Sequence, residues 1–200
     1  MSRARCERCL KPLSMCYCKD LTPEKATVDL LILQHFRETK HPLNTARIAE
    51  LGIENCHILA GEDFSQNATF NNLLQTKNAC LLFPSEQATS WQQLTSESEQ
   101  KPDLIIVLDG TWRKARKMLY LNPVLQSLPA VTLSEAAESN YRIRKASEES
   151  ALSTIEATVA LLREVSQDTH AHQNCLDSFE RMINMQIEAM GQSTFQKNYR

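Results

Sequence analysis

The chain has little glycine and proline, few aromatic residues and no long hydrophobic run. Four glycines and seven prolines among 200 residues exclude collagen-like and low-complexity chains. The longest apolar runs, such as Leu104–Leu108, are far too short to cross a bilayer, which takes about 20 residues. The N-terminus lacks the apolar segment of a secretory signal. We therefore expect a cytoplasmic protein with no membrane partner.

An excess of charge of one sign is also absent, because 22 basic residues are balanced by 24 acidic ones and the net charge is −2. This balance argues against a protein whose whole surface binds nucleic acid. The charges are unevenly spread, however. Residues 1–25 hold six basic against three acidic residues, a net of +3, and residues 110–147 hold seven against two, a net of +5. Local basic faces are therefore expected.

The apolar pattern after residue 26 predicts short strands that alternate with helices. Near-continuous aliphatic runs predict strands at 28–33, 56–59, 80–83, 103–108 and 130–133. Apolar residues at helical spacing, together with capping and stop residues, predict helices at 45–51, 111–121, 152–165 and 175–190. Such alternation is typical of an α/β fold with a mainly parallel sheet flanked by helices. We expect this main domain over 26–200, after a small knuckle over 1–25.

Four of the seven cysteines, Cys6, Cys9, Cys16 and Cys18, fall within thirteen residues. An odd cysteine total without a secretory signal argues against a disulfide framework. Four thiolates are the set that a tetrahedral structural zinc ion requires, and the Cys-x2-Cys step lets two sulfurs reach one ion. An iron–sulfur cluster is the metal alternative, and incidental cysteines in a tail are the structural one. The remaining three cysteines are expected to be small buried apolar residues.

The most apolar strand ends at Asp109, directly before Gly110. In open parallel sheets, ligands bind outside the carboxyl ends of the strands. Asp109 is therefore a candidate general base, or a carboxylate that holds a substrate hydroxyl or ammonium group. The structural alternative is a helix N-cap. Trp112, just downstream, either packs under a ligand ring or fills the core.

Two segments could bind a polyanion. The helix after Asp109 would place Arg113, Arg116 and Lys117 on one face, with Lys114 elsewhere. A second basic run contains Tyr141, Arg142, Arg144 and Lys145. Tyr141 offers a stacking face, and an extended backbone would point both arginines to one side. The alternative for both segments is a solvated surface.

A polar loop follows the first strand and contains His35, Glu38, His41, Asn44 and Thr45. It should lie at the same carboxyl edge as Asp109, because consecutive parallel strands end on one side of a sheet. Two histidines and a glutamate raise the question of a second metal. Hydrogen bonding and loop anchoring are favoured, because no other ligand set is in register.

Taken together, these motifs resemble a known family. Asp109-Gly-Thr-Trp112 followed by Ala115 resembles the Asp-x-Thr-Trp-x-x-Ala signature of the DTW-domain family. His35-x-x-Glu38 with Asn44-Thr45 is similar to its second block. The third block is similar to Ser139-x-Tyr141-x-x-Arg144-Lys145 with Leu152-Ser-Thr-x-Glu-Ala157, and the cysteine knuckle matches the bacterial members. The resemblance runs over about residues 3–190. One departure is Ala146-Ser147, where the family pattern leads us to expect a proline.

The resemblance implies a tRNA-uridine aminocarboxypropyltransferase. Such enzymes transfer the 3-amino-3-carboxypropyl group of S-adenosylmethionine to N3 of a uridine in tRNA, typically at position 47 in bacteria. The product is acp3U, and methylthioadenosine is released. The implied fold is SPOUT-like, with a C-terminal trefoil knot that binds the co-substrate. Thr111, Trp112, Leu152, Ser153 and Thr154 would bind S-adenosylmethionine, and the basic segments would bind tRNA.

Two other functions stay open on the residues alone. An RNA methyltransferase that uses S-adenosylmethionine would release S-adenosylhomocysteine in place of methylthioadenosine. A non-catalytic zinc-knuckle protein would bind RNA but not the co-substrate. The oligomeric state does not follow from the sequence.

Overall fold

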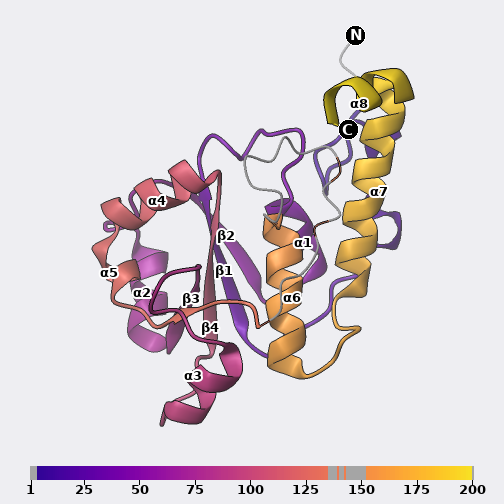
Figure 1. Cartoon of the computed structure of the whole chain (residues 1–200). Helices are drawn as coiled ribbons and strands as arrows, with labels where there is room; N and C mark the ends of the chain where they lie inside the picture. The colour runs from indigo at the N-terminus through magenta and orange to yellow at the C-terminus, as the bar shows by residue number, and fades with distance from the viewer. Residues whose placement is uncertain (1–3, 135–138, 140–141, 143–151, 200) are drawn as a thin grey trace.

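The computed structural model describes residues 4–134, 139, 142 and 152–199, and its centre is a five-stranded sheet (Figure 1). All strand pairs are parallel, in the order β2-β1-β4-β3-β5. The strands are β1 (Asp29–His35), β2 (Cys56–Gly61), β3 (Ala79–Leu82), β4 (Leu104–Asp109) and β5 (Ala130–Val131). The predicted α/β class with a parallel sheet is confirmed, and each predicted strand is present.

Helices cover both faces of this sheet. They are α1 (Ala46–Gly52), α2 (Ala68–Thr76), α3 (Trp91–Glu97), α4 (Trp112–Leu121), α5 (Pro123–Gln126), α6 (Thr154–Ser166), α7 (Gln173–Met190) and α8 (Gln192–Tyr199). Two short 3₁₀ helices, η1 (Leu13–Met15) and η2 (Cys18–Asp20), belong to the N-terminal segment. The four predicted helices correspond to α1, α4, α6 and α7. The sequence analysis missed α2, α3, α5 and α8.

Several boundaries differ from the prediction by one or two residues, and those of β1 and β5 are the most informative. β1 extends to Gln34 and His35, which are buried although polar. Their polarity ended the aliphatic run from which the strand was predicted, so the prediction stopped at residue 33. β5 ends at Val131, short of the predicted residue 133. It is the edge strand of the sheet, paired with β3 on one side and joined by a single bridge to Thr89 on the other.

The strands are aliphatic throughout because both faces of the sheet are buried. Leu30 and Ile32 of β1 pack into one hydrophobic cluster with α1, α6 and α7. Leu31 and Leu33 point to the opposite face and pack with side chains of α2, α4 and α5. Figure 1 shows the same division, with α1, α6 and α7 on one side of the sheet and α2, α4 and α5 on the other.

The N-terminal segment joins the larger of these clusters. Cys9, Tyr17 and Leu21 are buried in it together with side chains of α1 and α7. Gly52, at the end of α1, makes this packing possible. A Cβ there would lie 2.5 Å from Sγ of Cys175 and 2.7 Å from Cδ1 of Leu21.

The family resemblance implies a knot in the C-terminal chain, where the structure describes only Ser139 and Arg142 of residues 135–151. Because the path of the chain through that segment lies outside the described residues, the knot stays an expectation. Among the helices of the described part of the chain, none has the length and apolar composition needed to cross a membrane.

Candidate active site and metal centre

The carboxyl ends of β1 and β4 lie side by side. In the register of these strands, Gln34 is opposite Asp109. Gly110 follows, and a Cβ there would lie 3.1 Å from Cβ of Lys114 and 3.5 Å from Cβ of His35. Glycine therefore lets the chain leave β4 close to both β1 and the first turn of α4.

Asp109 is held at both of its carboxylate oxygens. Its side chain is only 7% exposed. Gln34 donates from Nε2 to Oδ2 at 2.7 Å, and the Thr154 hydroxyl donates to Oδ1. The Gln34 amide also donates to Oδ1 of Asn44 at 3.1 Å. Burial raises the pKa of Asp109 above its usual value, against the opposing effect of the hydrogen bonds from Thr154 and Gln34.

Asp109 is not the cap of the helix that follows it. The N-cap of α4 is Thr111, whose side-chain oxygen accepts a hydrogen bond from the Lys114 N–H. The capping alternative for Asp109 is therefore wrong. Trp112 is half-buried and meets Phe83 edge to face, with ring centroids 5.9 Å apart. It lies toward β3, since Phe83 directly follows that strand.

The first residues of α6 meet the same site. Ser153 caps the helix in a capping box: its side chain accepts from the Glu156 N–H, and its own N–H donates to the Glu156 carboxylate at 2.8 Å. Ser139 donates to that carboxylate as well, at 3.0 Å. Of the residues predicted to bind the co-substrate, Ser153 and Thr154 thus use their side-chain oxygens for hydrogen bonds within the protein. Leu152 precedes the cap and is half-buried.

Of the basic face predicted for α4, Lys117 is paired, and so is Lys114, which the prediction placed off that face. Lys117 forms an ion pair with Glu62 at 2.9 Å, and Lys114 pairs with Glu38. Arg113 and Arg116 are exposed. Within the described ranges, these two arginines form no ion pair. Their positive charges are therefore available to a ligand.

The second basic run lies mostly outside the described residues, which exclude Tyr141, Arg144 and Lys145. Arg142 is exposed and donates to Oδ1 of Asn184 in α7 at 2.5 Å.

The loop after β1 is anchored by hydrogen bonds and ion pairs, as predicted. His35 is 2% exposed; its Nε2 lies 2.6 Å from Oε1 of Glu62, and its Nδ1 accepts the Arg37 N–H. With Glu38 paired to Lys114, these groups do not converge on one point. In the described part of the chain, the four N-terminal cysteines are the only histidine, cysteine or carboxylate cluster that could hold a metal.

The sequence analysis missed Gln34 and Glu62. Gln34 holds Asp109, and Glu62 links the end of β2 both to His35 and to α4. A signal for Gln34 was available, because it is a polar residue that directly continues a fully aliphatic buried strand. Such a residue needs a hydrogen-bond partner, and the end of the neighbouring strand supplies it.

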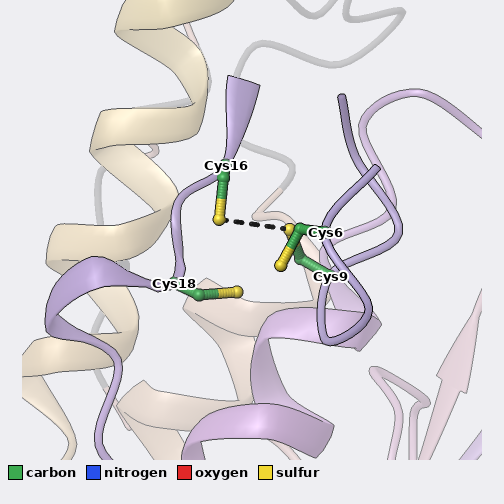
Figure 2. Close-up of side chains that lie close together, drawn as sticks. All are labelled: Cys6, Cys9, Cys16 and Cys18. Atoms are coloured by element: carbon green, nitrogen blue, oxygen red, sulfur yellow. Dashed lines mark hydrogen bonds between the residues drawn. The ribbon is translucent and has the colours of Figure 1, made fainter. Parts of the chain in front are cut away.

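The four N-terminal sulfur atoms converge, and Figure 2 shows Cys6 and Cys9 facing Cys16 and Cys18. All four Sγ atoms lie within 4.8 Å of one another, and those of Cys9 and Cys16 are 3.8 Å apart. Zinc–sulfur bonds of about 2.3 Å in a tetrahedron place the sulfurs about 3.8 Å from each other. The donor set and its spacing therefore fit zinc.

The electrostatics of this cluster also favour a cation. Backbone N–H groups of Cys9 and Arg8 hydrogen-bond to Cys6 and lower its pKa to about 6. Burial and the neighbouring sulfurs raise the pKa of Cys18. Four thiolates this close repel one another, so all of them ionise together only around a positive ion. The hydroxyl of Tyr17 is buried beside them with no hydrogen-bond partner in the described structure.

The cysteine knuckle is fastened to α1 and to the loop after β1. Arg47 of α1 donates from Nε to the carbonyl of Arg8 at 3.0 Å. Lys11 donates to the carbonyl of Pro42. The cysteine knuckle thus connects to the loop that carries Asn44, the partner of Gln34.

Comparison with known proteins yields one family. Residues 3–187 match the DTW domain. The chain is 28% identical over 193 residues to tRNA-uridine aminocarboxypropyltransferase 2 of Drosophila melanogaster, covering 93% of this chain and 76% of that one. It is 26% identical over 203 residues to the protein of the same name in Mus musculus, covering 98% and 68%. No solved structure is significantly similar to the chain.

Proposed function

The chain belongs to the DTW-domain family, and from this premise we propose that it is a tRNA-uridine aminocarboxypropyltransferase. It transfers the 3-amino-3-carboxypropyl group of S-adenosylmethionine to N3 of a uridine in tRNA, at position 47, and forms acp3U. The observation that carries the proposal is the family match over nearly the whole chain, together with relatives that bear this name. A SPOUT-like arrangement of the C-terminal residues forms part of the proposal.

Asp109 is the proposed general base. Uridine N3 is a weak nucleophile until its proton leaves, and a carboxylate with a raised pKa accepts a proton better than an ordinary aspartate. As the N3 proton passes to Asp109, the N3 electron pair forms the bond to the terminal carbon of the aminocarboxypropyl group. The carbon–sulfur bond breaks, and its electron pair stays on sulfur in neutral methylthioadenosine.

The surrounding residues hold this carboxylate in position. Gln34 and Thr154 bind one oxygen each, so Asp109 is oriented before any substrate arrives. Because Thr154 starts α6, its contact with Asp109 also brings the first turn of that helix to the site. The first N–H groups of a helix have no acceptor within the helix and suit the carboxylate of S-adenosylmethionine. Leu152, Ser153, Thr111 and Trp112 complete the proposed co-substrate site.

The zinc that we propose for the four cysteines is structural. With all four positions occupied by thiolates, such a site leaves no place for a substrate. The arginines at 113 and 116 and the basic run at 141–145 bind the tRNA backbone in this proposal.

Product analysis tests the reaction. The purified protein is incubated with S-adenosylmethionine and unmodified tRNA, and the nucleosides are then analysed by mass spectrometry. We expect acp3U and methylthioadenosine in equal amounts. A methylated nucleoside with S-adenosylhomocysteine would identify a methyltransferase instead, and binding of tRNA without any product would support the non-catalytic alternative.

The substitution Asp109→Asn tests the base. The Thr154 hydroxyl can rotate to accept a hydrogen bond from the new amide, so the fold should tolerate the change. Turnover should fall about 10²–10⁴-fold, with tRNA affinity and melting temperature little changed. Asp103→Asn, before the opposite end of β4, is the matched control and should keep full turnover. Near-normal turnover in Asp109→Asn would show that Asp109 is not the base. Loss of S-adenosylmethionine binding would instead indicate that Asp109 anchors the ammonium group of the co-substrate.

A further inference from the structure

An exposed aromatic ring lies at the carboxyl edge of the sheet. Phe36 directly follows β1, whose residues Leu30–His35 are all buried, and yet its side chain is 48% exposed. The ring stacks on the imidazole of His35, with centroids 4.7 Å apart and planes inclined by 20°. An exposed ring next to a candidate active site is a feature that the proposed chemistry has not used.

The stack has a fixed support. Both nitrogens of His35 have partners, Nε2 at 2.6 Å from Glu62 and Nδ1 at 3.1 Å from the Arg37 N–H. Its Cβ borders the chain at Gly110, so β4 confines it from the side. An aromatic ring on a fixed support loses little conformational freedom when a second ring stacks on it.

The surroundings of Phe36 are basic. The Arg37 guanidinium lies 5.6 Å from the Phe36 ring centroid. Arg37 and Lys40 are both exposed. The two carboxylates of this region are paired with lysines, Glu38 with Lys114 and Glu62 with Lys117. Exposed aromatic rings among cationic side chains are typical of sites where unpaired bases stack while the phosphates are neutralised.

Phe36 also lies just past the strand end that borders Asp109. Gln34 is opposite Asp109 in the sheet, and Phe36 comes two residues later. On the other side of Asp109, toward β3, lie Trp112 and Phe83. Phe36, which follows β1, therefore lies on the other side of β4 from Trp112, one of the residues expected to bind the co-substrate.

We infer that Phe36, supported by His35, is the stacking platform for the nucleobase of the acceptor nucleotide of tRNA. This inference rests on the proposed function for the identity of that base. Arg37 and Lys40 neutralise the adjoining phosphates. The platform holds an unpaired pyrimidine next to Asp109, which selects a base displayed in a loop over one stacked in a helix.

The variants Phe36→Leu and Phe36→Tyr distinguish the effect of the aromatic ring from the effect of the apolar surface. Leucine keeps the apolar surface and loses the aromatic face, so tRNA affinity should fall about 5- to 150-fold, the range found for loss of base–aromatic stacking. Tyrosine should retain affinity close to the wild type. Both variants should keep the wild-type melting temperature and S-adenosylmethionine affinity. Unchanged tRNA affinity in Phe36→Leu would overturn the inference, as would a loss confined to S-adenosylmethionine binding.

A second measurement does not depend on catalysis. A tRNA transcript carrying 5-bromouridine in place of uridine is irradiated in complex with the wild-type protein, and the crosslinked peptide is identified by mass spectrometry. We expect the crosslink at Phe36; a crosslink that avoids 29–45 would refute the platform. If the wild type binds and crosslinks in this way but makes no acp3U, the proposed reaction is wrong and the platform stands.

Discussion

Removal of zinc should undock the N-terminal knuckle while the sheet stays folded. The knuckle has few backbone hydrogen bonds of its own, and its four cysteines repel one another once a cation no longer holds them. The main sheet does not depend on those sulfurs, because β1 to β5 pair with each other. The expected result is a local loss of structure against α1 and α7.

The size of the effect can be estimated from Tyr17, which is fully buried between the knuckle and the core. Burial of a tyrosine removes about 150–250 Å² from water, which contributes about 4–6 kcal/mol at 25 cal/mol per Å². Its unpaired hydroxyl costs about 1–3 kcal/mol. A net loss of about 3 kcal/mol corresponds to a fall of about 6–12 °C in melting temperature for a chain of this size.

The assay compares metal content and thermal unfolding before and after treatment with a zinc chelator. The purified wild type should contain about one zinc per chain, and Cys9→Ser should contain none and melt like the chelated protein. Cys80→Ala is the matched control, since Cys80 is buried in β3 and does not belong to the four N-terminal cysteines. This variant should bind zinc normally. Protein without zinc, an iron–sulfur absorbance, or a melting temperature insensitive to the chelator would refute the reasoning.

Three further predictions concern the site and the core. The double change Arg113→Glu with Arg116→Glu should weaken tRNA binding and flatten its salt dependence, while S-adenosylmethionine affinity, measured by calorimetry, stays unchanged. Thr154→Val removes a donor that lowers the pKa of Asp109, so the acid limb of kcat/KM should move to higher pH, and Thr154→Ser should restore it. Burial lowers the pKa of His172 below 6.5, so its contribution to stability is present above pH 6.5 and lost as the pH falls through the folded-state value. Urea unfolding at pH 5.5 and 7.5 should show this loss in the wild type and less of it in His172→Asn, a residue that tolerates the backbone φ of 55°.

The strands and the metal cluster could be predicted because their signals are local. Leu104–Leu108 consists of aliphatic residues alone and lacks the alternating polar residues of a strand with one exposed face. This pattern is typical of a strand that is buried on both faces. The cysteines lie so close in sequence that any compact turn brings their sulfurs together. Helices α2 and α3 gave weaker signals, because each is short and buries a single large aromatic residue, Phe70 or Trp91. Their clearest marks were the capping residues before them.

The contacts within the site could not be predicted, because they join distant parts of the chain. Asp109 binds Gln34, 75 residues earlier, and Thr154, 45 residues later. Sequence spacing places each residue near a strand end or a helix start but does not say which atoms meet. The charge of Lys117 is a similar case: the helical pattern put it on the exposed face, and only the fold showed that Glu62 neutralises it.

These contacts also explain why a structural zinc would matter to a reaction in which it takes no part. Lys11 binds the carbonyl of Pro42, at the end of the loop that follows β1. Two residues later, Asn44 accepts the hydrogen bond from Gln34, and Gln34 holds Asp109. An undocked knuckle would release this loop and loosen the carboxylate. Chelation should therefore lower turnover as well as stability, although every group assigned to the chemistry lies outside the metal centre.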